Sequence, residues 1–148
     1  MQRPALTLAL WLVFFGISTS AQDNRAPSAT TSEESSAVSA TVKNYIEAYY
    51  TGDALRMRQT LHPHYLKHMI HGDIPMREKT AAQMVQEIRS NGPSEQPQAD
   101  KTEQISVLDV AGDIASAKLV TPGWVDYMTL SKLDGQWKIL SVVQRIDN

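Results

Sequence analysis

The chain has 148 residues, of which 42% are hydrophobic and 20% charged, and it contains no cysteine. This length and composition fit one globular domain and leave little room for a second. The formal net charge of −2 argues against the broad basic face that nucleic-acid-binding proteins use, so no nucleic-acid partner is expected. Without cysteine there is no disulfide framework, no thiol catalysis and no lipid anchor on a cysteine.

Residues 1–21 have the pattern of a secretory signal peptide. Arg3 precedes an apolar run from Ala5 to Ile17, and small residues follow as far as Ala21. The run is shorter than the about 20 apolar residues of a transmembrane helix. We therefore expect cleavage near Ala21 and an exported protein, periplasmic or secreted, with no membrane contact beyond the signal peptide; an uncleaved anchor is the alternative.

Residues 22–36 contain no large apolar side chain and predict a disordered leader, with a single domain over residues 37–148. Thr31 and Glu34 form a possible capping box at the start of the first helix. The apolar face of this helix follows helical spacing and ends before Gly52; it comprises Val38, Val42, Tyr45, Ile46 and Tyr49.

Two shorter helices are expected next. Asp53 is a helix N-cap, and Pro63 ends the second helix because its ring disfavours helical backbone at His62. A short extended piece covers residues 65–70 and is broken by Gly72 and Pro75. The third helix has the clearest signals: a capping box of Thr80 and Gln83, apolar residues at helical spacing, and an end at Asn91-Gly92-Pro93.

From residue 103 onward apolar residues alternate with a period of two, which predicts four strands. Asp134-Gly135 is a strong hairpin signal, because both central residues of a type I′ turn need positive φ. The connections are short, so the strands form an antiparallel meander. We expect an α+β fold with three N-terminal helices packed on a curved, mainly antiparallel sheet; the strands of the meander are residues 103–110, 114–121, 124–133 and 136–146.

Several stretches, in this order, resemble the nuclear transport factor 2-like superfamily and its putative lumazine-binding (SnoaL-like) subgroup. The resemblance implies the cone-shaped fold of that superfamily over about residues 38–146. Superfamily members include isomerases, dehydratases, polyketide cyclases and non-catalytic partners, so it does not by itself imply one activity. The stretches are YIEAYYTGD (45–53), LHPHYLKHMI (61–70), residues 79–92, WVDYMTL (124–130) and DGQWKI (134–139).

Asp126 is the most informative candidate for chemistry. It shares one strand face with Trp124, Met128 and Leu130, so on a concave sheet it would project among apolar side chains. Burial there would raise its pKa and suit it to acid–base catalysis. The simpler alternative is that Asp126 caps a loop or pairs with a lysine or arginine.

Four histidines lie within ten positions, at His62, His64, His68 and His71. Their spacing is poor for zinc, and no nearby carboxylates complete a ligand set, so we expect neither a metal nor another cofactor. Surface or structural histidines are the main expectation. The alternative is that His62 lines the mouth of a pocket and acts beside Asp126 as acid or base.

Aromatic side chains are expected to wall an apolar pocket for a flat organic molecule, although core packing would account for most of them. The candidate ligand-binding residues are Tyr45, Tyr49, Tyr65, Trp124, Met128 and Trp137.

The opposite sheet face is also apolar and predicts a homodimer through the sheet. Its expected members are Val125, Tyr127, Leu140, Val142 and Ile146.

Three functions remain open from the sequence. The first is an exported protein that binds a small organic molecule. The second is a cofactor-free isomerase, dehydratase or cyclase that uses Asp126 with a histidine or tyrosine. The third is a protein-interaction or assembly module, which a pocket filled by its own side chains would favour.

Overall fold

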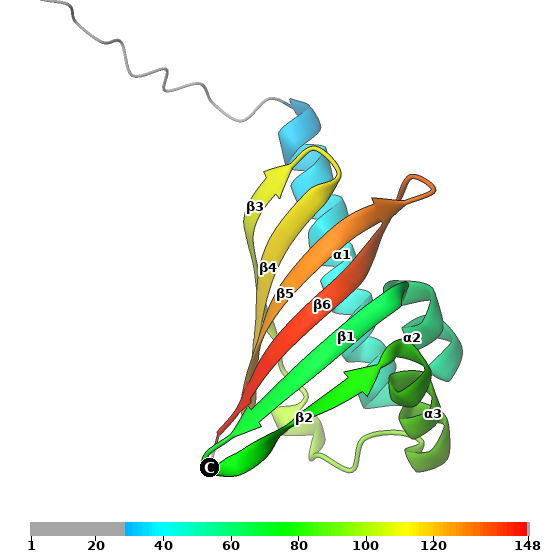
Figure 1. Ribbon diagram of the computed structural model, residues 1–148, viewed down its shortest axis with the longest axis vertical. Coiled ribbons are helices and arrows are strands. Elements are labelled where there is room, and N and C mark those ends of the chain that lie inside the picture. The colour runs from blue at the N-terminus through cyan, green and yellow to red at the C-terminus, as the bar shows by residue number, and fades with distance from the viewer. Residues whose placement is uncertain (1–28, 148) are drawn as a thin grey trace, which may run out of the picture.

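The computed structural model describes residues 29–147 and, among side chains, residues 31–147. The predicted signal peptide lies outside these residues. Figure 1 shows a strongly twisted sheet with α1 crossing behind it and with α2 and α3 beside one end. The helices are α1 (Ala29–Thr51), α2 (Ala54–Thr60) and α3 (Ala81–Asn91), with a short 3-10 turn at Gln98–Asp100. None of the described helices is long and apolar enough to cross a membrane.

Six strands form one sheet in the order β2-β1-β6-β5-β4-β3. All neighbours are antiparallel except β1 and β6, which are parallel. The α+β prediction is therefore confirmed, including the meander of the last four strands. The strands are β1 (Leu61–His71), β2 (Ile74–Thr80), β3 (Gln104–Ala111), β4 (Ile114–Thr121), β5 (Trp124–Leu133) and β6 (Gln136–Ile146).

Helix α1 starts earlier than the sequence indicated. Residues 29–36 are helical, which corrects the leader boundary predicted at residue 36, and Thr31 lies inside the helix instead of capping it. Glu34 explains the longer helix: its carboxylate accepts a hydrogen bond from Trp137 Nε1 at 2.8 Å and pairs with Lys132 Nζ at 2.5 Å. These contacts tie the first turns of α1 to the β5–β6 hairpin.

The other helix boundaries follow their local signals. The Asp53 side chain accepts a hydrogen bond from the backbone N–H of Arg56 at 2.9 Å, and the capping box of Thr80 and Gln83 is present. Pro63 does not end a helix, because β1 has already begun at Leu61. The sequence did not predict β2, because Gly72 and Pro75 indicate a break. In the structure Gly72 forms the turn of the β1–β2 hairpin, and Pro75 lies on the edge strand, where no partner strand needs its missing N–H.

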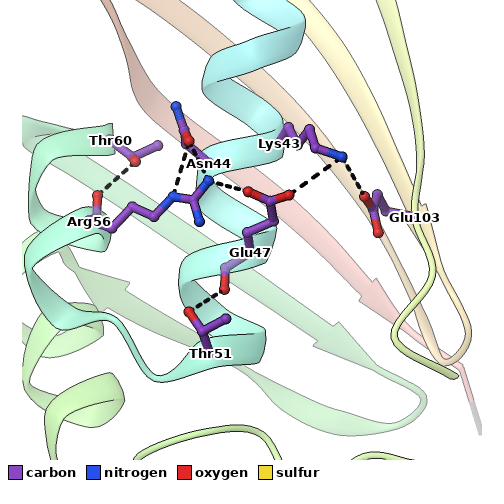
Figure 2. A network of polar contacts seen from close by, with 7 residues as sticks. All are labelled: Lys43, Asn44, Glu47, Thr51, Arg56, Thr60 and Glu103. Carbon is purple, nitrogen blue, oxygen red and sulfur yellow. Dashed lines mark hydrogen bonds and ion pairs between the residues drawn. The ribbon is translucent and has the colours of Figure 1, made fainter. Parts of the chain in front are cut away.

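A polar network connects α1 to α2 and to the segment before β3 (Figure 2). The Arg56 guanidinium donates to Asn44 Oδ1 at 2.7 and 3.0 Å and pairs with Glu47. Lys43 Nζ lies 3.4 Å from carboxylate oxygens of both Glu47 and Glu103. The network therefore holds α2 against α1 and ties α1 to Glu103, just before β3.

A register shift between β5 and β6 changes which side chains face inward. Thr129 pairs with Ser141 but Leu130 pairs with Ile139, so Leu140 is an extra residue, a β-bulge. Strict alternation would put Val142 on the outer face, whereas it is fully buried on the inner one, and Ile146 lines the inner pocket described below. The expected outer-face membership of Val142 and Ile146 is therefore wrong.

Gly52 lies where two segments of backbone approach closely. Its φ is +72°, and a Cβ there would lie 2.4 Å from the carbonyl carbon of Gly92. Gly112 has a similar φ of +64° but open space around it, which makes it a matched control.

We predict that Gly112→Ala lowers the free energy of unfolding by about 1 kcal/mol and that Gly52→Ala lowers it by roughly 2 kcal/mol more. Urea denaturation measures both; equal losses would contradict the close approach.

Candidate functional site

A pocket of about 200 Å³ opens between α1, α3 and the inner face of the sheet, where the ends of β5 and β6 meet β1 and β2. One part of its wall is aromatic. The rings of Tyr49 and Trp124 meet edge to face with their centroids 5.6 Å apart. The apolar and aromatic lining consists of Tyr45, Ile46, Tyr49, Met69, Met84, Trp124 and Ile146.

The rest of the lining is charged or polar, so the pocket is amphipathic and not apolar as expected. Lys67 comes from β1, Arg77 and Lys79 from β2, and Glu87 from α3. Lys79 forms an ion pair with Glu87. Among the residues that the structure describes, no carboxylate lies within ion-pairing distance of Arg77. Gln144 completes the polar lining.

Beneath the pocket lies a buried ion pair. Lys67 Nζ is 3.5 Å from Asp126 Oδ1, and the side chains are 6% and 0% exposed. Neither Asp126 oxygen accepts a hydrogen bond of good geometry within residues 29–147. Burial raises the pKa of Asp126 and lowers that of Lys67, and the attraction between the two charges opposes both shifts. Each charge thus offsets part of the burial cost of the other.

Two tyrosine hydroxyls lie beside this pair. Lys67 Nζ donates a hydrogen bond to the Tyr45 hydroxyl at 3.0 Å. The Tyr65 hydroxyl is buried beside Tyr45 and makes no hydrogen bond of good geometry in the described part of the chain. Burial raises the pKa of both phenols, so both stay neutral at physiological pH. The site therefore combines a buried amine, a carboxylate and two neutral hydroxyls.

The predicted site residues separate into two groups. Tyr45, Tyr49 and Trp124 line the pocket. Tyr65 and Met128 are buried in the hydrophobic core and are absent from the lining. Asp126 is on the inner face as predicted, but it too is absent from the lining, whereas its partner Lys67 is part of it.

Trp137 lies at a different place from the pocket. It borders a hollow of about 690 Å³ between α1, α2 and the β5–β6 turn. This hollow is larger and more open, but its cations already have partners: Arg56 pairs with Glu47, and Lys138 donates to the backbone carbonyl of Gln59. Within residues 31–147, no member of a buried ion pair borders it, whereas Lys67 of the buried pair with Asp126 lines the smaller pocket. We therefore take the smaller pocket as the candidate site.

His62 does not come near Asp126. It lines a separate surface hollow with Arg58 and Val85, and its ring centroid lies 5.6 Å from that of His64. His68 Nε2 is 3.0 Å from a carboxylate oxygen of Glu78 on β2. Within residues 29–147, no group of three or more histidine and acidic side chains could hold a metal ion. The proposed pairing of His62 with Asp126 is therefore wrong.

The basic residues of the pocket were missed from the sequence. The sequence did contain a signal for Lys67. It lies two residues from both Tyr65 and Met69, so on a strand all three share one face, and in the structure all three are buried. Arg77 and Lys79 had no such signal, because the segment around Gly72 and Pro75 was interpreted as a break. Their place in the pocket depends on the β1–β2 pairing.

The family model described as putative lumazine-binding matches residues 33–144. The chain belongs to this family. It is a member of the nuclear transport factor 2-like superfamily, as the order of elements predicted. No curated protein matches the sequence significantly.

Solved structures with the same fold are distant in sequence. An NTF2-like protein of unknown function from Silicibacter pomeroyi is 20% identical, with a TM-score of 0.65 over 79% of this chain and 98% of that one. A ketosteroid isomerase-like protein from Erwinia carotovora is 13% identical, with a TM-score of 0.56 over 78% and 98%. A putative dehydratase from Streptomyces avermitilis is 15% identical, with a TM-score of 0.51 over 79% and 98%. At these identities the likeness establishes the fold alone.

The buried pair predicts strong coupling between Lys67 and Asp126. Asp126→Asn leaves a buried ammonium without its counter-charge and should lower the free energy of unfolding by about 3 kcal/mol. Lys67→Met leaves the Asp126 carboxylate without its counter-charge and should lower it by a similar amount. The double variant should lose at least about 1 kcal/mol less than the sum. Urea denaturation of the four proteins measures this. Glu78→Gln, which breaks the exposed pair with His68, is the control and should change stability by under about 1 kcal/mol. Additive losses would contradict the coupling.

Proposed function

We propose that this protein binds a small organic molecule in the pocket between α1, α3 and the inner face of the sheet. One observation carries the proposal: Tyr49 and Trp124 wall a cavity of about 200 Å³ that also contains the buried amine of Lys67. Aromatic walls with a few converging polar groups are typical of small-molecule sites.

The size of the pocket limits the ligand. Its volume equals that of roughly six or seven water molecules. Pockets for drug-sized ligands are larger, at about 300–1,000 Å³. A single flat ring system therefore suits the cavity better than an extended molecule. The family description names lumazine, a bicyclic heteroaromatic compound, which supports a ligand of this class.

The other two functions have less support. An acid–base enzyme would need Asp126 to reach the ligand, but Asp126 does not line the pocket and is already paired with Lys67. Similarity to an isomerase-like protein and a putative dehydratase supports that alternative at the level of fold only. An interaction module would be favoured by a pocket filled with its own side chains, whereas this one is open and Met128 and Trp137 lie outside it.

Native mass spectrometry of the protein purified from its own host, followed by denaturation, tests binding. We expect one stoichiometric organic molecule. Trp124→Ala should reduce its occupancy at least about tenfold without unfolding the domain, because ring contacts hold it. Leu108→Ala, an exposed truncation on β3 outside the pocket, should not change it. An empty protein whose melting temperature is unaffected by lumazine and other small bicyclic aromatic compounds would overturn the proposal.

We also propose that the protein is exported, on the basis of residues 1–21. The same denatured mass spectrum reports the mature N-terminus. A chain that begins at Gln22 supports cleavage by a signal peptidase, and a full-length chain contradicts it.

A homodimer through the outer sheet face is a further proposal. Val143 pairs in register with His68 on β1 and with Tyr127 on β5, and Ile70 lies on the same face. The side chains of Ile70, Tyr127 and Val143 are 44–52% exposed on these three adjacent strands. Such a patch is typical of an association surface.

Light scattering at micromolar concentration measures the mass. We expect a dimer that Tyr127→Glu converts to a monomer by placing an unpaired charge in the interface. Leu55→Glu, on exposed α2, is the control. A monomeric wild-type protein would end this proposal.

A further inference from the structure

We propose that the ligand carries an acidic group and that Arg77, with Lys67 and Lys79, binds it. The inference rests on the proposed function, since it names the chemical class of molecule that the same pocket takes.

The charges around the pocket do not balance. Three cations, Lys67, Arg77 and Lys79, face two carboxylates, Asp126 and Glu87. Lys67 pairs with Asp126 and Lys79 with Glu87, so Arg77 has no acidic partner among the described residues. An acidic ligand would neutralise the remaining positive charge.

The β1–β2 register concentrates positive charge on one face. Lys67 is directly opposite Lys79, and Met69 is directly opposite Arg77. Cross-strand partners share a face, and like charges directly opposite each other are destabilising. Lys79 accordingly contributes to lowering the pKa of Lys67, after burial as the main cause. Glu87, which pairs with Lys79, already offsets part of this repulsion. An anion bound between Arg77 and the two lysines would relieve more of it.

The side chains suit a carboxylate attached to a ring. A guanidinium binds a carboxylate through two parallel hydrogen bonds. An ammonium has three donors, and Lys67 uses one for Tyr45 while facing Asp126. The aromatic wall of Tyr49 and Trp124 belongs to the same cavity. The pocket therefore offers charge for the acid and apolar surface for the ring.

Isothermal titration calorimetry with two matched pairs of probes tests the inference. Benzoate is compared with benzamide, and 2-naphthoate with 2-naphthamide, because each pair differs in charge but hardly in shape. We expect the wild-type protein to bind the acids about tenfold more tightly than the amides. Arg77→Gln should lower this ratio several-fold while the amides bind unchanged, because Lys67 and Lys79 remain. Glu87→Gln should raise the ratio, because it releases Lys79. Arg58→Gln, which removes an exposed arginine of α2 outside the pocket, should leave it unchanged.

The outcomes separate this inference from the proposed function. Amides that bind the wild-type protein as tightly as the acids would overturn the acid preference and leave the pocket as a binding site. If Arg77→Gln and Arg58→Gln change the ratio equally, the effect comes from overall charge. That result would also overturn the acid preference and leave the pocket as a binding site. Failure of all four probes, together with a neutral molecule purified in the pocket, would also overturn it. Failure of the probes with an empty pocket would overturn both proposals.

Discussion

The ion pair of Lys67 and Asp126 is the constraint on which the inner face of the sheet depends. Two charges are removed from water in the interior of a small domain, and the pair spans β6 to join β1 to β5. Neither charge could stay there alone without a large free-energy cost. The hydroxyl of Tyr45 brings α1 into the same cluster through its hydrogen bond with Lys67. This cluster therefore links α1, β1 and β5 at one point beside the pocket.

The pocket takes its character from elements added at the edge of the meander. Strand β2 and helix α3 contribute Arg77, Lys79 and Glu87, while the meander and α1 contribute the aromatic wall. One cavity therefore has a charged side and an apolar side. The fold is shared with proteins whose names indicate different activities, so the chemistry has to be argued from these side chains and not from the fold.

Local signals predicted most of the fold because they act over a few residues. Thr80 with Gln83 caps α3 within one turn, and Asp134-Gly135 adopts the positive φ values that a type I′ hairpin requires. The errors arose where a local rule was overridden. Gly72 and Pro75 suggest a break, yet they form a hairpin turn and an edge strand. The start of α1 depends on the contact between Glu34 and the distant Trp137.

By itself, the sequence predicted the order and kind of the elements except β2. It also placed Asp126 on one strand face with Trp124, and Tyr45 and Tyr49 on the apolar face of the first helix. These follow from periodicity and turn chemistry, which are properties of adjacent residues. Only the tertiary structure decided that Lys67 faces Asp126, that His62 lies elsewhere and that Val142 turns inward. The physical reason is that strand pairing and a single bulge at Leu140 set which side chains meet, and both depend on residues far apart in the chain.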